Sequence, residues 1–321
     1  MMSSGNFCMY FCRFIDVYKY RENVLYKLMS ILGSVDFTKP LIEHLFKTAC
    51  GEHRVENKIL MNVFFEPSTR TSFSFECAMK RLGGEVINFT KETSSINKGE
   101  TYEDTIRSLS CYADIMVVRH PNKDYIKRAS EVSSIPIING GNGNGEHPTQ
   151  ALLDLYTMYK KWGNGFETKS VLFVGDIKNS RTIHSLVSLM KNYPEMKIQY
   201  LAYDGCGPDE SMLKQVSEEH GQKLEEIEIN KVENYDLYDV IYCTRRQKER
   251  ENGIVGEPDI IVDEEFADKL KDDAIIMHPL PRNSELCVSV DSNKRCYYFE
   301  QMKYGVEIRM SLLYYMLNIK N

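Results

Sequence analysis

Three hydroxyl side chains and one guanidinium occupy four consecutive positions in the run EPSTRTSF. The residues before them, 59–65, are apolar and partly β-branched, as in a buried strand, and Pro67 ends that run. The residues after them repeat apolar side chains at helical spacing up to Gly83. A helix N-terminus that follows a strand presents free N–H groups and the positive end of the helix dipole, so the four side chains could bind a phosphate there. They are Ser68, Thr69, Arg70 and Thr71.

The alternative for this stretch is a capped helix whose hydroxyls only satisfy backbone donors. A helix cap needs only one hydroxyl side chain and does not require an arginine such as Arg70, so the residue types favour an anion site. Arg119 directly follows the apolar run IMVV and could bring a second positive charge to the same sheet edge. A lone arginine after a strand is otherwise a solvated surface charge.

His147 and Gln150 lie in GEHPTQ, just after the glycine-rich run NGGNGNG. That run does not fit a nucleotide-binding loop, because no GK[ST] follows it and no GxGxxG frame fits. We expect a flexible turn that presents the two side chains. His147 could donate to a carbonyl oxygen and stabilise an oxyanion, while Gln150 holds an amide nitrogen. A structural histidine is the alternative.

The second half of the chain carries two arginines after predicted strands, Arg181 in GDIKNSRT and Arg245 in TRRQKER. Each could hold one carboxylate in a bidentate fork, so an amino acid with two carboxylates fits the pair. A solvated charged turn is the alternative for the second run. Further on, HPLPR at residues 278–282 contains two prolines that fix a rigid turn, which either aims backbone carbonyls or is only structural.

Strands that alternate with helices place the chain in the α/β class, with two domains that each contain a mostly parallel sheet flanked by helices. Ligands of such sheets sit beyond the carboxyl ends of the strands, where the polar residues above cluster. We therefore expect a site with contributions from both domains, which close over the ligands. The expected domains are residues 34–147 with 304–321, and residues 148–303, preceded by an unassigned extension at residues 1–33.

The expected elements follow from apolar periodicity and from proline and glycine boundaries. A last apolar helix is expected to be buried against the first domain. The expected strands are residues 59–65, 85–89, 115–118, 136–138, 171–174, 197–202, 225–229, 240–243 and 274–277. The expected helices begin at residues 38, 68, 101 or 103, 125, 148, 182, 209, 263 and 306.

Composition narrows the function classes. With 321 residues, 42% hydrophobic and 27% charged, the chain is long enough for two globular domains, and its net charge of −6 argues against a nucleic-acid surface. Nine scattered cysteines without a CxxC pair suggest reduced thiols and a cytoplasmic location. Cys8 and Cys12 lie one helical turn apart but have no nearby histidine, so no metal site is expected.

No apolar run approaches the roughly 20 residues of a membrane span, so no membrane association is expected. Residues 1–33 are aromatic and partly apolar, which suits a weak targeting segment or a surface extension. A secretory signal is not supported, because charged residues interrupt the run and no small-residue cleavage site follows.

The run FFEPSTRTSFSFE resembles the carbamoyl-phosphate signature of the transcarbamoylases, the family of aspartate and ornithine carbamoyltransferases. VVRHP, HPTQALLD, TRRQKER and HPLPR match further family motifs in the family's order, from about Asp36 to the C-terminus. The resemblance implies an enzyme of pyrimidine synthesis, without metal or organic cofactor, that transfers the carbamoyl group of carbamoyl phosphate to L-aspartate. Alternatives are transfer to ornithine or another amine, and a catalytically silent homologue. An NAD-binding dehydrogenase is a further alternative, but this sequence lacks the glycine fingerprint of such enzymes and shares only the α/β pattern with them.

The resemblance also implies residue roles. The catalytic residues that it implies are Arg70, Thr71, His147 and Lys98. Aspartate is oriented by the two arginines of the second half together with Gln247 and Lys98. The residues implied for carbamoyl phosphate are Ser68, Thr69, Arg70, Thr71, Arg119, His147, Gln150, and the carbonyls of Leu280 and Pro281.

Lys98 lies in the polar run SSINKGET, where a surface lysine is the ordinary interpretation. By resemblance, Ser94 and Lys98 reach into the site of a neighbouring subunit, which implies a homotrimer with shared sites. Regulatory chains are possible for such a protein, but nothing in the sequence indicates them.

Two positions separate this chain from its wider family. Pro279 stands where ornithine enzymes carry a cysteine, which favours aspartate as the second substrate. Ser72 stands where many bacterial relatives have arginine. This departure leaves the phosphate donors in place but changes surface contacts of the helix or salt bridges between subunits.

Overall fold

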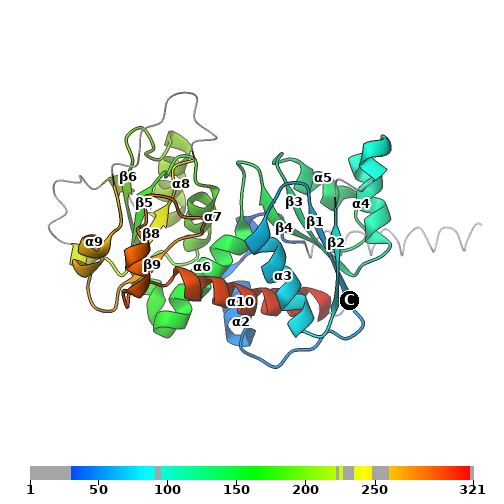
Figure 1. Cartoon of the computed structure of the whole chain (residues 1–321), viewed down its shortest axis with the longest axis horizontal. Helices are drawn as coiled ribbons and strands as arrows, with labels where there is room; N and C mark the ends of the chain where they lie inside the picture. Colours follow the sequence, from blue (N-terminus) through cyan, green and yellow to red (C-terminus); the bar gives the residue numbers. More distant parts are fainter. Residues whose placement is uncertain (1–29, 91–94, 222–223, 227–234, 248–259, 319–321) are drawn as a thin grey trace, which may run out of the picture. The chain divides into compact units, whose positions relative to one another are not determined.

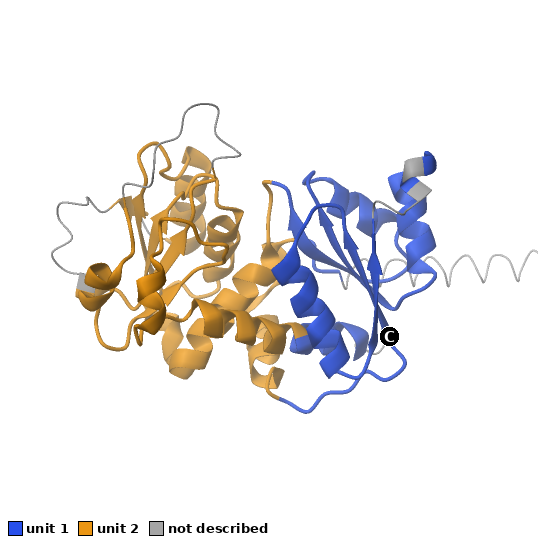
Figure 2. Ribbon diagram, viewed as in Figure 1, with its two compact units in different colours: residues 1–32, 51–143, 310–321 blue, residues 33–50, 144–309 orange. Residues whose placement is uncertain are grey.

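The computed structural model describes residues 30–90, 95–221, 224–226, 235–247 and 260–318 (Figure 1). The chain divides into two compact units (Figure 2). Unit 1 comprises residues 1–32, 51–143 and 310–321, and unit 2 comprises residues 33–50 and 144–309. Each unit contains a parallel sheet with helices, which confirms the predicted α/β class.

Unit 1 is built on a four-stranded parallel sheet in the order β2-β1-β3-β4. Met61 and Val63 of β1 lie in the core with Met116 and Val118 of β3, because alternate residues of neighbouring parallel strands share one face. The strands are β1 (Ile59–Phe64), β2 (Glu85–Phe89), β3 (Ile115–His120) and β4 (Ile137–Asn142). The helices are α3 (Thr69–Arg81), α4 (Tyr102–Ser110) and α5 (Tyr125–Val132), with a 3₁₀ turn, η3 (Ser95–Lys98).

Unit 2 is built on a five-stranded parallel sheet in the order β7-β6-β5-β8-β9. Its strands are β5 (Ser170–Gly175), β6 (Lys197–Ala202), β7 (Glu225–Glu226), β8 (Val240–Thr244) and β9 (Ile275–Met277). Its helices are α2 (Lys39–Thr48), α6 (Pro148–Trp162), α7 (Arg181–Met190), α8 (Glu210–His220) and α9 (Glu264–Asp268). Short 3₁₀ turns are η1 (Ser34–Asp36), η4 (Gly163–Thr168), η6 (Tyr235–Leu237) and η8 (Val288–Ser292).

The last helix, α10 (Tyr298–Asn318), begins eight residues before the expected start at residue 306. Its residues up to 309 belong to unit 2 and the following ones to unit 1. Gly305 lies inside the helix, where a Cβ would stand 3.2 Å from Leu153 Cδ2 of α6. The glycine therefore permits close packing of two helices, and it does not mark a helix boundary.

The glycine-rich run after residue 138 was expected to be a flexible turn, and this was wrong for its first half. Strand β4 continues to Asn142. A Cβ on Gly140 would stand 3.0 Å from Val117 Cγ1 and 3.3 Å from the Val118 carbonyl oxygen. Glycine at this position lets β4 approach β3 closely. The glycine-rich run, which usually indicates a loop, is therefore partly a strand in this protein.

The expected domain limits differ from those of the two compact units. Residues 34–50, 144–147 and 304–309 were expected in the first domain, but they lie in unit 2. The functional domain limits stay a prediction. The N-terminal extension up to residue 29, Cys8 and Cys12, and the expected continuation of β7 to residue 229 lie outside the described residues.

None of the helices in the described part of the chain combines the length and apolar character that crossing a membrane requires. Within the same residues, no group of three or more histidine, cysteine, aspartate or glutamate side chains is placed to hold a metal ion. The seven described cysteines carry free thiols.

Candidate active site

The phosphate-binding candidates of unit 1 stand where α3 begins, after β1. Ser68 is the N-cap residue with extended backbone (φ −158°, ψ 91°), but its side chain makes no capping hydrogen bond. Helix capping therefore does not explain this hydroxyl. Thr71 is 7% exposed, whereas Thr69 and Arg70 are exposed. The helix of 13 residues places the positive end of its dipole at these four residues.

Arg119 is the last residue but one of β3 and pairs in register with Phe64, the last residue of β1. Its Nε atom pairs with Glu66 Oε1 at 2.7 Å, and its Nη1 atom donates to the Gly140 carbonyl oxygen at 3.2 Å. Glu66 is two residues before Ser68 in the chain. The structure thus brings Arg119 to the same carboxyl edge of the sheet as residues 68–71, as the sequence predicted, and Glu66 helps to hold it there.

Lys98 is exposed at the end of η3 in unit 1. Ser94 lies outside the described residues. The predicted contribution of these two residues to a neighbouring subunit stays a prediction.

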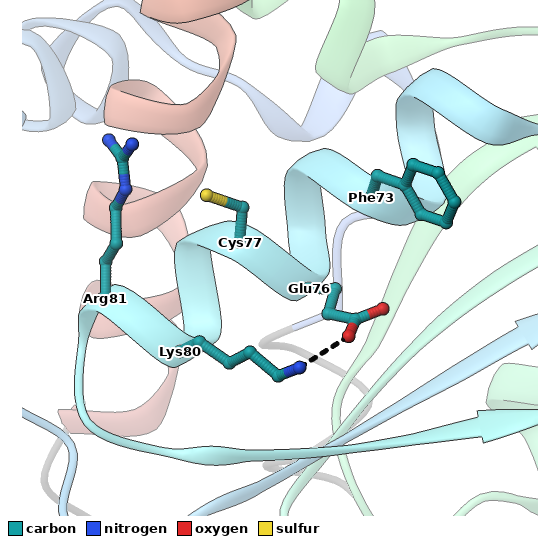
Figure 3. A pocket seen from close by; sticks show the side chains of 5 residues that line it. All are labelled: Phe73, Glu76, Cys77, Lys80 and Arg81. Carbon is teal, nitrogen blue, oxygen red and sulfur yellow. Dashed lines mark hydrogen bonds and ion pairs between the residues drawn. The ribbon is translucent and has the colours of Figure 1, made fainter.

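A separate hollow lies on the outer side of α3 (Figure 3). Glu76 and Lys80 form an ion pair of 2.7 Å beside it. None of residues 68–71 lines this hollow, so it is not the predicted phosphate site. Its lining residues are Phe73, Glu76, Cys77, Lys80 and Arg81.

His147 and Gln150 both stand at the start of α6, in unit 2. His147 is the N-cap residue and 5% exposed, and its backbone N–H donates to Ser185 Oγ at 2.9 Å. Pro148 occupies the first helical position, where its missing N–H costs nothing. Gln150 donates from Nε2 to Asp154 Oδ1 at 2.9 Å, one helical turn along.

Asp154 is fully buried and accepts three hydrogen bonds from three different helices and strands. Besides Gln150 of its own helix, Gln301 of α10 donates to Oδ1 at 2.6 Å and Tyr242 of β8 donates to Oδ2 at 2.9 Å. Burial raises the pKa of the Asp154 carboxyl to about 7, although these three donors act in the opposite direction. Arg309, also buried, is the nearby positive charge, and burial lowers its pKa to about 10.

The two arginines predicted to bind a dicarboxylate both lie at the carboxyl edge of the sheet in unit 2. Arg181 is the first residue of α7 after β5, and Arg245 directly follows β8. Strands β5 and β8 are neighbours and pair up to Gly175 and Thr244. A Cβ at Gly175 (φ +119°) would stand 2.2 Å from the Thr244 carbonyl oxygen, so only glycine allows this approach.

Asp176 ties the segments that carry these arginines together. It is fully buried, and its Oδ2 atom accepts the Gln247 backbone N–H at 2.9 Å. Its Oδ1 atom accepts the Asn179 backbone N–H at 3.0 Å. Thr244 Oγ1 donates to Ser180 Oγ at 3.2 Å across the same edge. The segment after β8 and the loop before α7 therefore form one hydrogen-bonded unit.

The HPLPR turn follows β9 and is held by its own histidine. His278 Nδ1 accepts the Leu280 N–H at 2.8 Å, so its proton lies on Nε2, which donates to Glu285 Oε1 at 3.1 Å. Burial alone would raise the pKa of Glu285, but hydrogen bonds from His278 and Asn283 hold it below its ordinary value. Leu280 has φ +54°, a conformation that few non-glycine residues adopt, and Pro281 is exposed.

Sequence reasoning missed four side chains that hold this edge of unit 2. Asp154 had a usable signal, because Gln150 and Asp154 stand at i and i+4 on one helix. Asp176 stands directly after a buried strand. Gln301 had no local signal, because its partners Asp154 and His278 are far away in the chain. Glu285 had none either, because it lies in an irregular segment where no periodicity relates it to its partner His278.

Two family models match the chain. The aspartate/ornithine carbamoyltransferase carbamoyl-P binding domain matches residues 30–160, and the Asp/Orn binding domain of the same family matches residues 167–316. Among curated relatives, the aspartate carbamoyltransferase catalytic subunit of Clostridium acetobutylicum is 42% identical over 298 residues, which cover 88% of this chain and 96% of the relative. That of Archaeoglobus fulgidus is 45% identical over 280 residues, 84% of this chain and 91% of the relative.

The chain also matches part of a larger relative and a solved structure. It is 40% identical over 303 residues to the multifunctional protein pyr-3 of Neurospora crassa, of which it spans 16%. The crystal structure of aspartate transcarbamoylase from Trypanosoma cruzi with carbamoyl aspartate and phosphate is 39% identical, with a TM-score of 0.81 over 89% of this chain and 94% of that one. These matches cover both units, and the chain belongs to the aspartate/ornithine carbamoyltransferase family.

Proposed function

We propose that this chain is an aspartate carbamoyltransferase, a transferase that joins carbamoyl phosphate and L-aspartate into N-carbamoyl-L-aspartate and phosphate. The match to catalytic subunits over most of their length supports this activity. One observation carries the choice of aspartate: Arg181 and Arg245 lie at the carboxyl edge of one sheet, on segments that Asp176 holds together. Two guanidinium groups there suit the two carboxylates of aspartate.

The phosphate of carbamoyl phosphate is held in unit 1. Ser68, Thr69, Arg70 and Thr71 supply hydroxyls, backbone N–H groups and a positive charge at the N-terminus of α3, and Arg119 adds a second charge. Thr71 and His147 donate to the carbonyl oxygen and stabilise its negative charge in the tetrahedral intermediate. Gln150 and the carbonyls of Leu280 and Pro281 accept from the carbamoyl nitrogen and the incoming amine.

The reaction needs orientation more than acid–base chemistry. Arg181, Arg245 and Gln247 hold aspartate, with Lys98 contributed by a neighbouring subunit, so that the deprotonated amine attacks the carbonyl carbon. A C–N bond forms, the bond from carbon to the phosphate oxygen breaks, and the departing phosphate takes the amine proton. None of the assigned residues has to act as a general base.

The assembly proposed for this enzyme is a homotrimer, in which Ser94 and Lys98 of one subunit complete the site of the next. The exposed position of Lys98 at the end of η3 is compatible with that role. The location proposed is the cytoplasm, because the seven cysteines in the described part of the chain carry free thiols, as is usual in a reducing compartment.

The purified chain tests the activity directly. Incubated with carbamoyl phosphate, it is expected to release phosphate when L-aspartate is added and to stay at the background rate with ornithine. If phosphate were released with ornithine but not with aspartate, ornithine would be the second substrate and the choice of aspartate would be wrong. No release with either amino acid would reject the transferase.

A further inference from the structure

The Asp154 carboxylate lies at the centre of a hydrogen-bonded chain that reaches two parts of the proposed carbamoyl site. On one side it receives Gln150 Nε2 at 2.9 Å. On the other it receives Gln301 Nε2 at 2.6 Å, and Gln301 Oε1 accepts the backbone N–H of His278 at 3.0 Å. His278 in turn accepts the Leu280 N–H. One buried carboxylate thus connects the side chain of Gln150 to the turn that carries Leu280 and Pro281.

The orientation of each amide in this chain is determined by its partners. Gln301 must turn its oxygen toward the His278 N–H, which leaves its nitrogen to face Asp154. A carboxylate offers only acceptors, so Gln150 must also present its nitrogen to it. Among the described residues, Gln150 Oε1 accepts no hydrogen bond. This oxygen is therefore the end of the Gln150 side chain that remains to accept an N–H donor.

We infer that Asp154 is a positioning residue that selects a ligand bearing an N–H group: it fixes the Gln150 amide with its oxygen toward the carbamoyl nitrogen, and through Gln301 it holds the 278–281 turn. The inference rests on the proposed function, and it predicts that the site prefers a carbamoyl group to an acetyl group. Acetyl phosphate has a methyl group in place of the amino group and cannot donate to this oxygen.

The titratable groups that act on Asp154 lie on β8 and α10. Tyr242 of β8 is fully buried, and burial together with the Asp154 charge raises its pKa well above the ordinary value, so its hydroxyl stays protonated and donates. Arg309 of α10 supplies the balancing positive charge. Three hydrogen-bond donors and one cation favour the ionised form of Asp154, whereas burial favours the protonated form. Which end of the Gln150 amide faces Asp154 therefore depends on the ionisation of this carboxyl group.

A double-mutant cycle in the full-length enzyme tests this role, with carbamoyl phosphate as substrate and acetyl phosphate as a competitor. Asp154→Asn is expected to raise the KM for carbamoyl phosphate about 10-fold. The inhibition constant of acetyl phosphate is expected to change by less than about twofold. In a Gln150→Ala background, Asp154→Asn is expected to add less than about threefold to that KM, because the side chain it positions is absent.

The inference would be overturned if Asp154→Asn weakened the binding of both ligands equally. It would also be overturned if Asp154→Asn raised the KM as much in the Gln150→Ala background as in the wild type. Asp239→Asn is the matched control, since Asp239 is also a buried carboxylate of unit 2, bonded to Lys169, Lys271 and Ser170, and it is expected to leave the ratio of the two constants unchanged. A wild-type chain without carbamoyl transfer would instead reject the proposed function itself.

Tyr242→Phe keeps the test decisive if Asp154→Asn does not fold. It removes one hydroxyl and preserves the ring, which packs on Phe173 with centroids 5.7 Å apart. Loss of this donor raises the pKa of Asp154 further, so the acid limb of kcat/KM for carbamoyl phosphate is expected to move up by about half a pH unit or more. An acid limb identical to that of the wild type would contradict the positioning role.

Discussion

Asp176 Oδ2 accepts the backbone N–H of Gln247 at 2.9 Å, although the two residues are 71 positions apart in the chain. The bond joins the end of β5 to the segment after β8, and each of these segments carries one of the arginines proposed to hold aspartate. Asp176 is buried and is not among the residues proposed to hold either ligand, so we expect it to act on the second substrate only through the loops it fixes.

Asp176→Ala is therefore expected to raise the KM for aspartate about 10-fold, with little change in the KM for carbamoyl phosphate. Steady-state kinetics with each substrate varied in turn checks the split. Asp263→Ala is the control: Asp263 caps α9 by accepting the Phe266 N–H, so its loss is expected to lower stability by about 1 kcal/mol without changing either KM. Parallel changes in both KM values would argue against the assignment of Asp176.

Arg245→Ala is expected to raise the KM for aspartate about 10- to 100-fold, because a charge-assisted bond to one carboxylate is lost. The adjacent Arg246, whose Nη2 donates to the Asp204 carbonyl oxygen, provides the comparison. Arg246→Ala is expected to stay within about threefold of the wild type. If the two variants lost aspartate affinity equally, general surface charge rather than a specific clamp would be responsible.

Arg70→Ala is expected to lower kcat about 10²- to 10³-fold, since it removes a charge that stabilises the departing phosphate. Arg81→Ala, at the other end of the same helix, is expected to be close to the wild type. Rapid-mixing measurements of phosphate release give kcat for both. A normal kcat in Arg70→Ala would remove this residue from the catalytic group.

Shared sites can be tested by mixing two inactive variants. Lys98→Ala and Arg70→Ala chains, unfolded and refolded together, are expected to recover about a quarter of wild-type activity if each site combines residues of two subunits in a closed ring. Native mass spectrometry establishes that mixed trimers have formed. Mixed trimers without recovered activity would place Lys98 outside the neighbouring site.

The pH dependence of stability should reveal the buried carboxyl of Asp154. Its pKa in the folded chain, about 7, is above the ordinary value of 3.8, so the folded state holds a proton that the unfolded state has released. Its contribution to stability is complete below about pH 4 and is lost as the pH rises through 7. Relative to Asp154→Asn, the wild type is expected to lose about 3 kcal/mol between pH 5 and pH 8.

Urea unfolding followed by the fluorescence of Trp162 measures this difference, because Trp162 is the single tryptophan and lies on α6 with Asp154. Parallel stability curves for the two chains over this pH range would show that the Asp154 pKa is not raised by folding.

The sequence was sufficient for most of the fold because local patterns carried it. Strand β2 begins and ends at the expected residues 85 and 89, and helix α5 begins at the expected residue 125. Phe75, Ala78 and Met79 are buried on α3, as their spacing predicted. The residues at strand ends were found for the same reason, since Arg119 and Arg245 directly follow apolar runs.

The remaining features depend on contacts between distant segments. Gly140 was expected in a flexible turn, and the last helix was expected to begin only after Gly305. Each glycine instead allows a neighbouring element to approach closely, which no local pattern reveals. Two of the three partners of Asp154 come from β8 and α10, 88 and 147 residues away. A buried carboxylate of this kind can be recognised only when the donors around it are known.

The most direct test of the account offers both amino acids to the enzyme at once. The purified chain is incubated with ¹³C-labelled carbamoyl phosphate and equal concentrations of L-aspartate and L-ornithine, and the products are followed by carbon NMR. The label is expected to accumulate in carbamoyl aspartate, and Arg245→Ala is expected to reduce this product strongly. Label in carbamoyl ornithine, or a wild-type chain that forms neither product, would contradict this expectation.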